Sequence, residues 1–158
     1  MDSRAKGYRF ENLCCRILTA LYAPMIDPTG PLETLPFRRR SVSIMPLVGH
    51  WRGSGDILWR PENDLPFVVE CKSCEGWELD GAFYAEKWPP LLWWKQAAEQ
   101  AERQKRTTGQ QARPLLFFTR NLRPVYCMAS MPDVAALLGG RVGVPDRKQS
   151  WCPARSPA

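Results

Sequence analysis

The sequence predicts an α/β fold in which a mixed central sheet carries helices on both faces. Apolar residues recur at helical spacing at the start of the chain and again after residue 88. Short apolar runs bounded by turn-forming residues lie between and after these two segments. The predicted order is αβββαβ with a short final helix, and a mixed order of this kind packs helices against the faces of a sheet.

The helices are predicted from apolar spacing and end signals. Asp2 or Ser3 can cap the first helix, which is expected to reach about Tyr22. Proline opens the second, at 89–108, and Gly109 ends it. The expected buried stripe of the first helix consists of Phe10, Leu13, Cys14, Ile17, Leu18 and Leu21.

Short apolar runs are predicted to be the strands. The segments DILWR and PFVVECKS are joined by PENDL, whose turn-forming composition predicts an antiparallel hairpin. The predicted strands surround Val42 and Ile44 and occupy 56–60, 66–73, 113–120 and 124–129, and a short helix follows at 131–140.

Length and composition predict one domain. A chain of 158 residues can bury a core without disulfides or metals. Residues 1–142 are expected to form this domain, and the polar, proline-bearing residues 143–158 a flexible tail. The sequence has neither a membrane-length apolar stretch nor a signal-peptide pattern at its start. We therefore expect a cytoplasmic protein, in the host cytoplasm if it is viral, that does not contact a membrane.

The six cysteines are expected to be reduced thiols in this compartment. Cys71 and Cys74 form a Cys-x-x-Cys pair, but the sequence offers no second such pair and no paired histidines to complete a zinc or iron–sulfur site. His50 is the only histidine, which argues against a catalytic triad.

An excess of positive charge favours polyanionic partners. The formal charge is +6 and the pI is about 9.2, a balance typical of nucleic-acid binders. Residues 95–123 hold seven basic side chains against two acidic ones. Phosphate contacts are predicted for Arg4, Lys6, Arg9, Arg38, Arg39, Arg40, Arg52 and Lys95.

A carboxylate and an amine interrupt one apolar strand. Side chains alternate along a strand, so Glu70 and Lys72 share one face while Val69 and Cys71 share the other. Such a pair often marks only a solvated face. The predicted hairpin, however, brings Asp56 close to Glu70, and two neighbouring carboxylates repel unless a cation lies between them. Magnesium needs only one or two protein carboxylates, so the pattern indicates a metal site for phosphodiester hydrolysis.

The aromatic residues at the start of the second long helix admit two interpretations. Trp88, Trp93 and Trp94 could stack on exposed bases, but aromatic residues in this position more often pack in a core or at a subunit contact. We favour packing.

The segment GDILWRPENDLPFVVECK resembles the active-site signature of the PD-(D/E)XK nuclease superfamily, with Gly55 where the name has proline. The start, SRAKGYRFENLCCRIL, is similar to that of archaeal-type Holliday junction resolvases. The resemblance implies a restriction-endonuclease-like core. It also implies that Asp56 and Glu70 bind metal, with Glu11 as the acid from the first helix and Lys72 as the active-site lysine.

The same resemblance assigns Gln96 to the site as a residue that steadies the attacking water or the metal shell. It implies Mg²⁺ as cofactor, with Mn²⁺ able to substitute, and branched DNA as substrate. Symmetric cutting of a four-way junction needs two sites related by a twofold axis, so a homodimer is expected.

Two departures from the family pattern leave the substrate open. Residues 75–90 form a long aromatic insertion, and the family's serine has no certain counterpart among Ser41, Ser43 and Ser54. A nuclease of the same superfamily that acts on duplex, nicked or single-stranded DNA is therefore an alternative. A DNA-binding module without catalysis is the other alternative.

Overall fold

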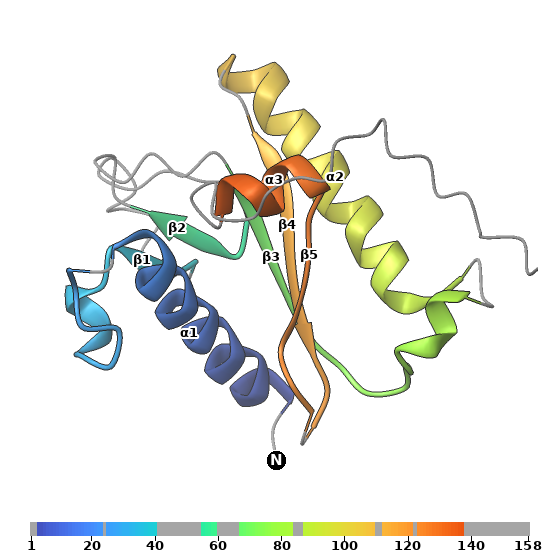
Figure 1. Ribbon diagram of the computed structural model, residues 1–158, viewed down its shortest axis with the longest axis horizontal. Helices are drawn as coiled ribbons and strands as arrows, with labels where there is room; N and C mark the ends of the chain where they lie inside the picture. Colours follow the sequence, from blue (N-terminus) through green and yellow to red (C-terminus); the bar gives the residue numbers. More distant parts are fainter. Residues whose placement is uncertain are drawn as a thin grey trace, which may run out of the picture.

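The structure is a computed structural model, and it describes residues 3–23, 25–40, 55–59, 67–83, 87–109, 112–121 and 123–137. Figure 1 shows how the helices and strands are arranged. In chain order they are α1 (Ser3–Tyr22), η1 (Leu32–Thr34), β1 (Phe37–Arg39), β2 (Ile57–Trp59), β3 (Phe67–Ser73), η4 (Asp80–Phe83), α2 (Pro89–Thr108), β4 (Arg113–Thr119), β5 (Tyr126–Met128) and α3 (Met131–Leu137).

The described strands form two sheets. β1 and β2 pair antiparallel, and the other sheet has the order β3–β4–β5. β3 and β4 are parallel over their whole lengths, and β5 is antiparallel to β4. Parallel neighbours need a long crossover connection, which α2 supplies. The mixed α/β class is thus confirmed, whereas one continuous αβββαβ sheet stays a prediction.

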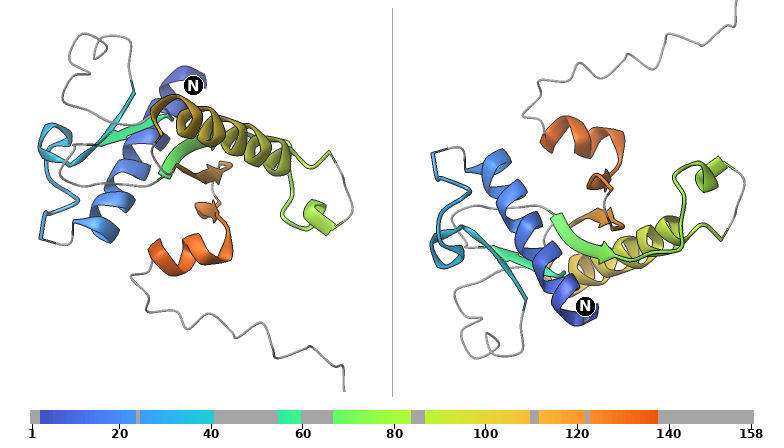
Figure 2. Two further views of the ribbon diagram at one scale, coloured as in Figure 1. Left: turned by 90° about the horizontal axis from the view of Figure 1, so that it is seen from above. Right: turned by 90° about the horizontal axis from the view of Figure 1, so that it is seen from below.

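α1 and α2 lie on opposite sides of β3 and β4 in the views of Figures 1 and 2. The core clusters agree with this arrangement. Val69, Cys71, Leu115 and Phe117 pack with buried residues of α1, whereas Val68 packs with Ala101 of α2. Because successive strand residues point to opposite faces, each helix covers one face of this sheet.

The buried stripe of α1 differs from the predicted one. Leu13 and Leu21 are each 43% exposed. Their places in the core are taken by Cys15 and Thr19, and the Thr19 hydroxyl donates to the backbone oxygen of Cys15. The buried face is therefore rotated about the helix axis toward the 11–15–19 row, because the sheet contacts select the face and apolar counting alone does not.

α2 has the predicted bounds and end signals. It begins at Pro89 and ends before Gly109, whose positive φ of 68° is the left-handed conformation that favours glycine at a helix end. Trp88 is buried and packs with Trp77 and Phe118, while Trp93 and Trp94 pack against the same cluster. The interpretation of these tryptophans as packing residues is confirmed.

The predicted hairpin is not found among the described residues. β2 pairs with β1, and β3 pairs with β4. The segments around β2 and β3 meet instead at Asp56, just ahead of β2, through a backbone hydrogen bond. Turn-forming composition predicts that a chain reverses, but it does not specify which strand edges then pair.

Several predictions concern residues outside the described part of the chain. They are the strand around Val42 and Ile44, the flexible tail at 143–158 and the end of the short helix after residue 137. Among the helices that the structure does describe, none has both the length and the apolar character needed to cross a bilayer.

Candidate active site

Asp56 lies where the two sheets meet. Its backbone N–H donates to the Val69 carbonyl oxygen at 2.8 Å, and its own carbonyl oxygen accepts from the Arg40 N–H at 2.6 Å. One residue thereby connects β3 to the segment that follows β1. This double attachment fixes the Asp56 backbone beside the centre of β3.

Gly55 permits this close approach. A Cβ atom at this position would overlap the Val69 carbonyl oxygen and would lie 2.9 Å from both the carbonyl carbon and the nitrogen of Val69. The glycine therefore takes the place of proline in the motif because the neighbouring backbone of β3 leaves no room for a side chain.

Glu70 and Lys72 emerge from β3 on the same face, as predicted from the alternation of side chains. Lys72 Nζ lies 2.6 Å from Glu70 Oε1 in an ion pair. The Glu70 side chain is 6% exposed and the Lys72 side chain 27% exposed. A nearly buried carboxylate thus has a cationic partner that still reaches solvent. Cys71, between them, packs in the core on the opposite face.

The Asp56 carboxylate is turned toward β3. Its Oδ2 atom accepts the backbone N–H of Cys71 at 2.8 Å. Burial and the neighbouring negative charge of Glu70 raise the pKa of Asp56, while the Cys71 N–H, Lys72 and Arg40 oppose this rise. Asp56 and Glu70 therefore come together as an electrostatically coupled pair, which is the arrangement that the motif predicts.

Glu11, on α1, interacts electrostatically with Asp56 and Glu70. Burial raises its pKa to about 7, and the charges of Asp56 and Glu70 add to the rise, while Arg39 and Lys72 oppose it. The rotated stripe of α1 accounts for this placement, because Glu11 lies one helical turn from the buried Cys15. Arg39 is also held over the Tyr8 ring, with 4.1 Å between Cζ and the ring centroid.

The pKa of Glu11 gives a prediction for the metal-free protein. Its folded pKa of about 7 lies above the ordinary value of 4.5, so its contribution to stability is complete below the ordinary value and is lost as pH rises through the folded value. Urea denaturation in chelator should show the wild type losing stability relative to Glu11→Gln between about pH 5 and pH 8. Glu102→Gln, at an exposed site on α2, is the control. Parallel pH curves for the wild type and Glu11→Gln would contradict the placement.

The carboxylates of Asp56 and Glu70 could supply only part of the ligands of a divalent cation. Substrate oxygens and water would have to supply the rest. Among the residues described, no three or more His, Cys, Asp or Glu side chains form a group that could hold a metal ion. Asp56 and Glu70 each use one oxygen in the contacts above and keep a second one. Magnesium commonly binds to one or two carboxylates together with water and substrate phosphate, and magnesium at Asp56 and Glu70 stays a prediction.

For most of the other predicted site residues, the structure gives the exposure of the side chain or a contact with a residue other than Asp56 and Glu70. Gln96 and Lys95 are exposed on α2, and the catalytic role of Gln96 stays a prediction. Lys6 forms an ion pair with Glu75 at 2.8 Å. Arg52 lies outside the described residues. The remaining predicted phosphate contacts are exposed or partly exposed around the start of α1 and the end of β1, at Arg4, Arg9, Arg38, Arg39 and Arg40.

A polar cluster at the ends of β3 and β4 was missed. Glu75 accepts from Lys6 and from the Asn121 N–H, and Arg120 pairs with Glu78. The long aromatic insertion was the available signal, but no spacing rule connects residues 75–78 with 120–121.

The comparison with protein families was informative, whereas the other two comparisons gave no match. Residues 2–141 match the model of a family described as "Phage putative PDDEXK endonuclease". No curated protein and no solved structure matches the chain significantly. The family match spans nearly the whole chain and includes Glu11, Asp56, Glu70 and Lys72. The chain therefore belongs to this phage PDDEXK endonuclease family.

Proposed function

We propose that the protein is a magnesium-dependent, structure-selective DNA endonuclease that hydrolyses phosphodiester bonds in four-way junctions. One observation carries the catalytic part of this proposal. Asp56 lies beside the centre of β3, where the charge of Glu70 helps to raise the pKa of Asp56, and Lys72 is ion-paired to Glu70. The carboxylate oxygens could bind a cation that contacts a phosphodiester, and the amine of Lys72, which reaches solvent, could contact an attacking water.

In this proposal, Asp56 and Glu70 hold the cation and Glu11 completes the acidic set. When bound, the ion would polarise the phosphodiester and lower the pKa of a water molecule. The Lys72 ammonium can donate hydrogen bonds to the attacking water or to a phosphate oxygen. Gln96 is proposed to steady the water shell. Manganese should replace magnesium, because both prefer oxygen ligands.

The basic residues position DNA without reading its bases. Arg38, Arg39 and Arg40 lie in and directly after β1, and the Arg40 backbone bonds to Asp56. Cations in this position would contact phosphates that flank the scissile bond. Contacts of this type set affinity and register rather than sequence preference, so binding should weaken steeply as salt rises.

Four-way junctions are the proposed substrate because the first residues of the chain resemble the start of Holliday junction resolvases. Lys6, Gly7 and Glu11 have the spacing that resembles junction resolvases, and the charges of Asp56 and Glu70 help to raise the pKa of Glu11. A homodimer is part of this proposal, since symmetric cutting requires two sites related by a twofold axis. Duplex, nicked or single-stranded DNA is the alternative substrate of the same site.

Substrate selection is tested by offering labelled DNA forms to the wild-type protein in magnesium. An immobile four-way junction, a matched linear duplex and a single strand should be compared at equal concentrations. Paired symmetric cuts in the junction, with little cutting of the others, are the expected result. Equal cutting of all forms would move the function to a general DNA nuclease, and binding without cutting in magnesium or manganese would favour a non-catalytic module.

A further inference from the structure

A second candidate binding site lies beyond the end of β3. An open pocket of about 450 Å³ on the surface, hereafter called the cavity, is lined by Trp77, Glu78, Asp80, Arg120, Arg123 and Tyr126, among others. Ligand pockets in proteins commonly have volumes of about 300–1,000 Å³. None of these residues is needed for the proposed hydrolysis, so the cavity requires a separate explanation.

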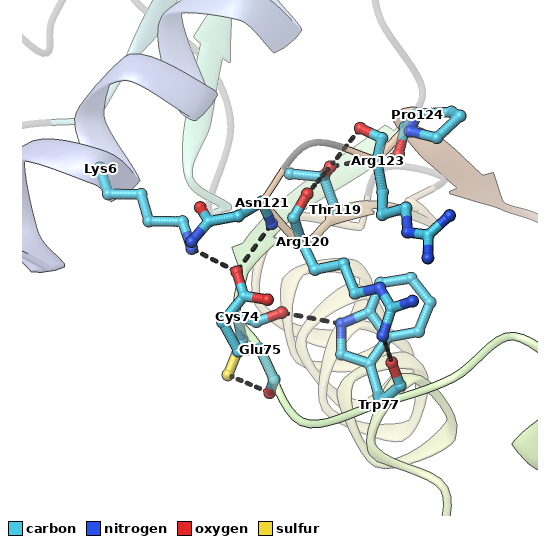
Figure 3. Close-up of polar contacts among 9 residues, drawn as sticks. All are labelled: Lys6, Cys74, Glu75, Trp77, Thr119, Arg120, Asn121, Arg123 and Pro124. Atoms are coloured by element: carbon cyan, nitrogen blue, oxygen red, sulfur yellow. Dashed lines mark hydrogen bonds and ion pairs between the residues drawn. The ribbon is translucent and has the colours of Figure 1, made fainter.

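The walls of the cavity are held in place by one local bond and by several bonds between segments distant in sequence (Figure 3). Trp77 Nε1 donates to the Cys74 carbonyl oxygen at 2.8 Å, and Arg120 Nη1 donates to the Trp77 carbonyl oxygen at 2.8 Å. Arg120 also contacts both carboxylate oxygens of Glu78. The Cys74 N–H donates to the Thr119 carbonyl oxygen at 3.1 Å. A preformed cavity avoids part of the cost of ordering its walls on binding.

The lining combines aromatic surface with balanced charge. Tyr126 is half-buried and stacks on Phe118, with 5.6 Å between ring centroids, and Trp77 meets the Tyr126 ring edge-on. The two arginines and two acids of the lining sum to a formal charge of zero. A phosphate would prefer a net positive site, whereas a nucleobase has an aromatic face and uncharged donors and acceptors on its edge.

Arg123 is the lining cation with a guanidinium available for a ligand. It is exposed, and within the described part of the chain its side chain makes no hydrogen bond, in contrast to the bidentate pairing of Arg120, although its charge helps to lower the pKa of Glu78. Figure 3 shows the Arg123 side chain extending beside that of Arg120. An arginine in this position can donate to acceptors on a base edge.

Strand register places the cavity close to the candidate active site. Lys72 of β3 pairs with Phe118 of β4, and Phe118 pairs with Tyr126 of β5. Paired residues point to the same face of a sheet, and adjacent strands lie about 4.8 Å apart. Lys72 and Tyr126 are therefore about 10 Å apart across the sheet. About three nucleotides of stacked strand cover this distance at 3.4 Å each.

We infer that the cavity binds a nucleobase that has left the stack of the DNA, within a few nucleotides of the proposed scissile phosphate. Tyr126 provides the stacking surface, Arg123 donates to the base edge, and the carboxylate of Asp80 accepts from an amino group of the base. This inference rests on the proposed function for the DNA ligand, but it makes no use of hydrolysis. Unpaired bases are available at branch points and in single strands.

The test compares two single-stranded hexanucleotides, one with all its bases and one with abasic central positions. Their phosphate charge is the same, so the ratio of their affinities isolates the contribution of the bases. Binding of the full-length protein is measured in chelator, which suppresses cleavage. The wild type should prefer the base-bearing strand by roughly tenfold, as expected for stacking of a base on an aromatic side chain.

Arg123→Gln and Tyr126→Leu should each lower this ratio several-fold. The matched control is Arg103→Gln, which removes the same charge from an exposed position on α2 and should weaken both strands equally. Thermal melting establishes that Tyr126→Leu is folded, and Arg123→Gln alters only a surface side chain. A ratio unchanged by both cavity variants, or lowered equally by Arg103→Gln, would overturn the inference.

The same measurement separates this inference from the proposed function. If cleavage is never observed but the cavity variants lower the ratio, the nucleobase site stands and the nuclease proposal fails. If cleavage occurs but the cavity variants leave the affinity ratio of the two strands unchanged, the nuclease proposal stands and the nucleobase site fails.

Discussion

Glu70→Gln and Asp56→Asn are each expected to lower the rate of DNA cleavage by more than about 100-fold while DNA binding in chelator is retained. Loss of residues that only support metal ligands costs about 10–100-fold in affinity or activity, and these carboxylates are the proposed ligands themselves. Each variant halves the negative charge offered to the cation by the pair. Labelled-strand cleavage and gel-shift titrations measure the two effects separately.

Both substitutions preserve the local hydrogen bonds. The Asp56 side chain accepts the Cys71 N–H, and an asparagine oxygen can accept it as well. Glu70 accepts from Lys72, and the glutamine oxygen can do so, although the ion pair becomes a contact between an ammonium and an uncharged amide. Glu102→Gln, an exposed site on α2, is the control for the same chemical change and should cleave at the wild-type rate. Retained cutting by Glu70→Gln or Asp56→Asn would exclude the two-carboxylate site.

Gly55→Ala is expected to destabilise the protein by about 1–3 kcal/mol, the usual cost of forcing extra atoms into packed structure, and to abolish most activity. The added Cβ would overlap the Val69 carbonyl oxygen, so Asp56 must move away from β3. This displacement breaks the backbone bond from Asp56 to Val69 and misaligns the carboxylate beside Glu70. Urea denaturation and cleavage assays on the same preparation measure both losses.

Gly7→Ala is the matched control for this prediction. Among the described residues, no atom beyond the neighbouring backbone of α1 lies within 4 Å of a Cβ built at Gly7, and alanine is a better helix former than glycine. This variant should gain about 0.5–1 kcal/mol in the free energy of unfolding. If Gly55→Ala is as stable and active as the wild type, Gly55 does not lie as close to the backbone of β3 as described.

The shared face of Glu70 and Lys72 could be predicted because it follows from a local rule. Alternation along a strand places Glu70 and Lys72 on one face, and the ion pair between them confirms this. The bounds of α1 and α2 also match the predicted ones, and proline opens α2 and Gly109 ends it as the sequence predicts. These features depend on neighbouring residues alone, so a single sequence contains the information.

Features that depend on distant contacts could not be predicted. Leu13 was expected in the core but is exposed, because packing against the sheet rotates the buried face of α1 toward Cys15. The same rotation accounts for the half-buried position of Glu11, which apolar spacing leaves at the edge of the stripe. The cavity joins Trp77 to Arg120 and Tyr126, and no local pattern connects these positions.

Metal-dependent hydrolysis at Asp56 and Glu70 is tested most directly by cleavage of one labelled four-way junction. The wild type and Asp56→Asn are compared, each in magnesium and in chelator. Wild-type cleavage in magnesium alone, with none by Asp56→Asn in either condition, is the predicted result. It would establish that hydrolysis requires both a divalent ion and the Asp56 carboxylate. Equal cleavage in chelator, or by Asp56→Asn, would contradict the metal-dependent site at Asp56 and Glu70.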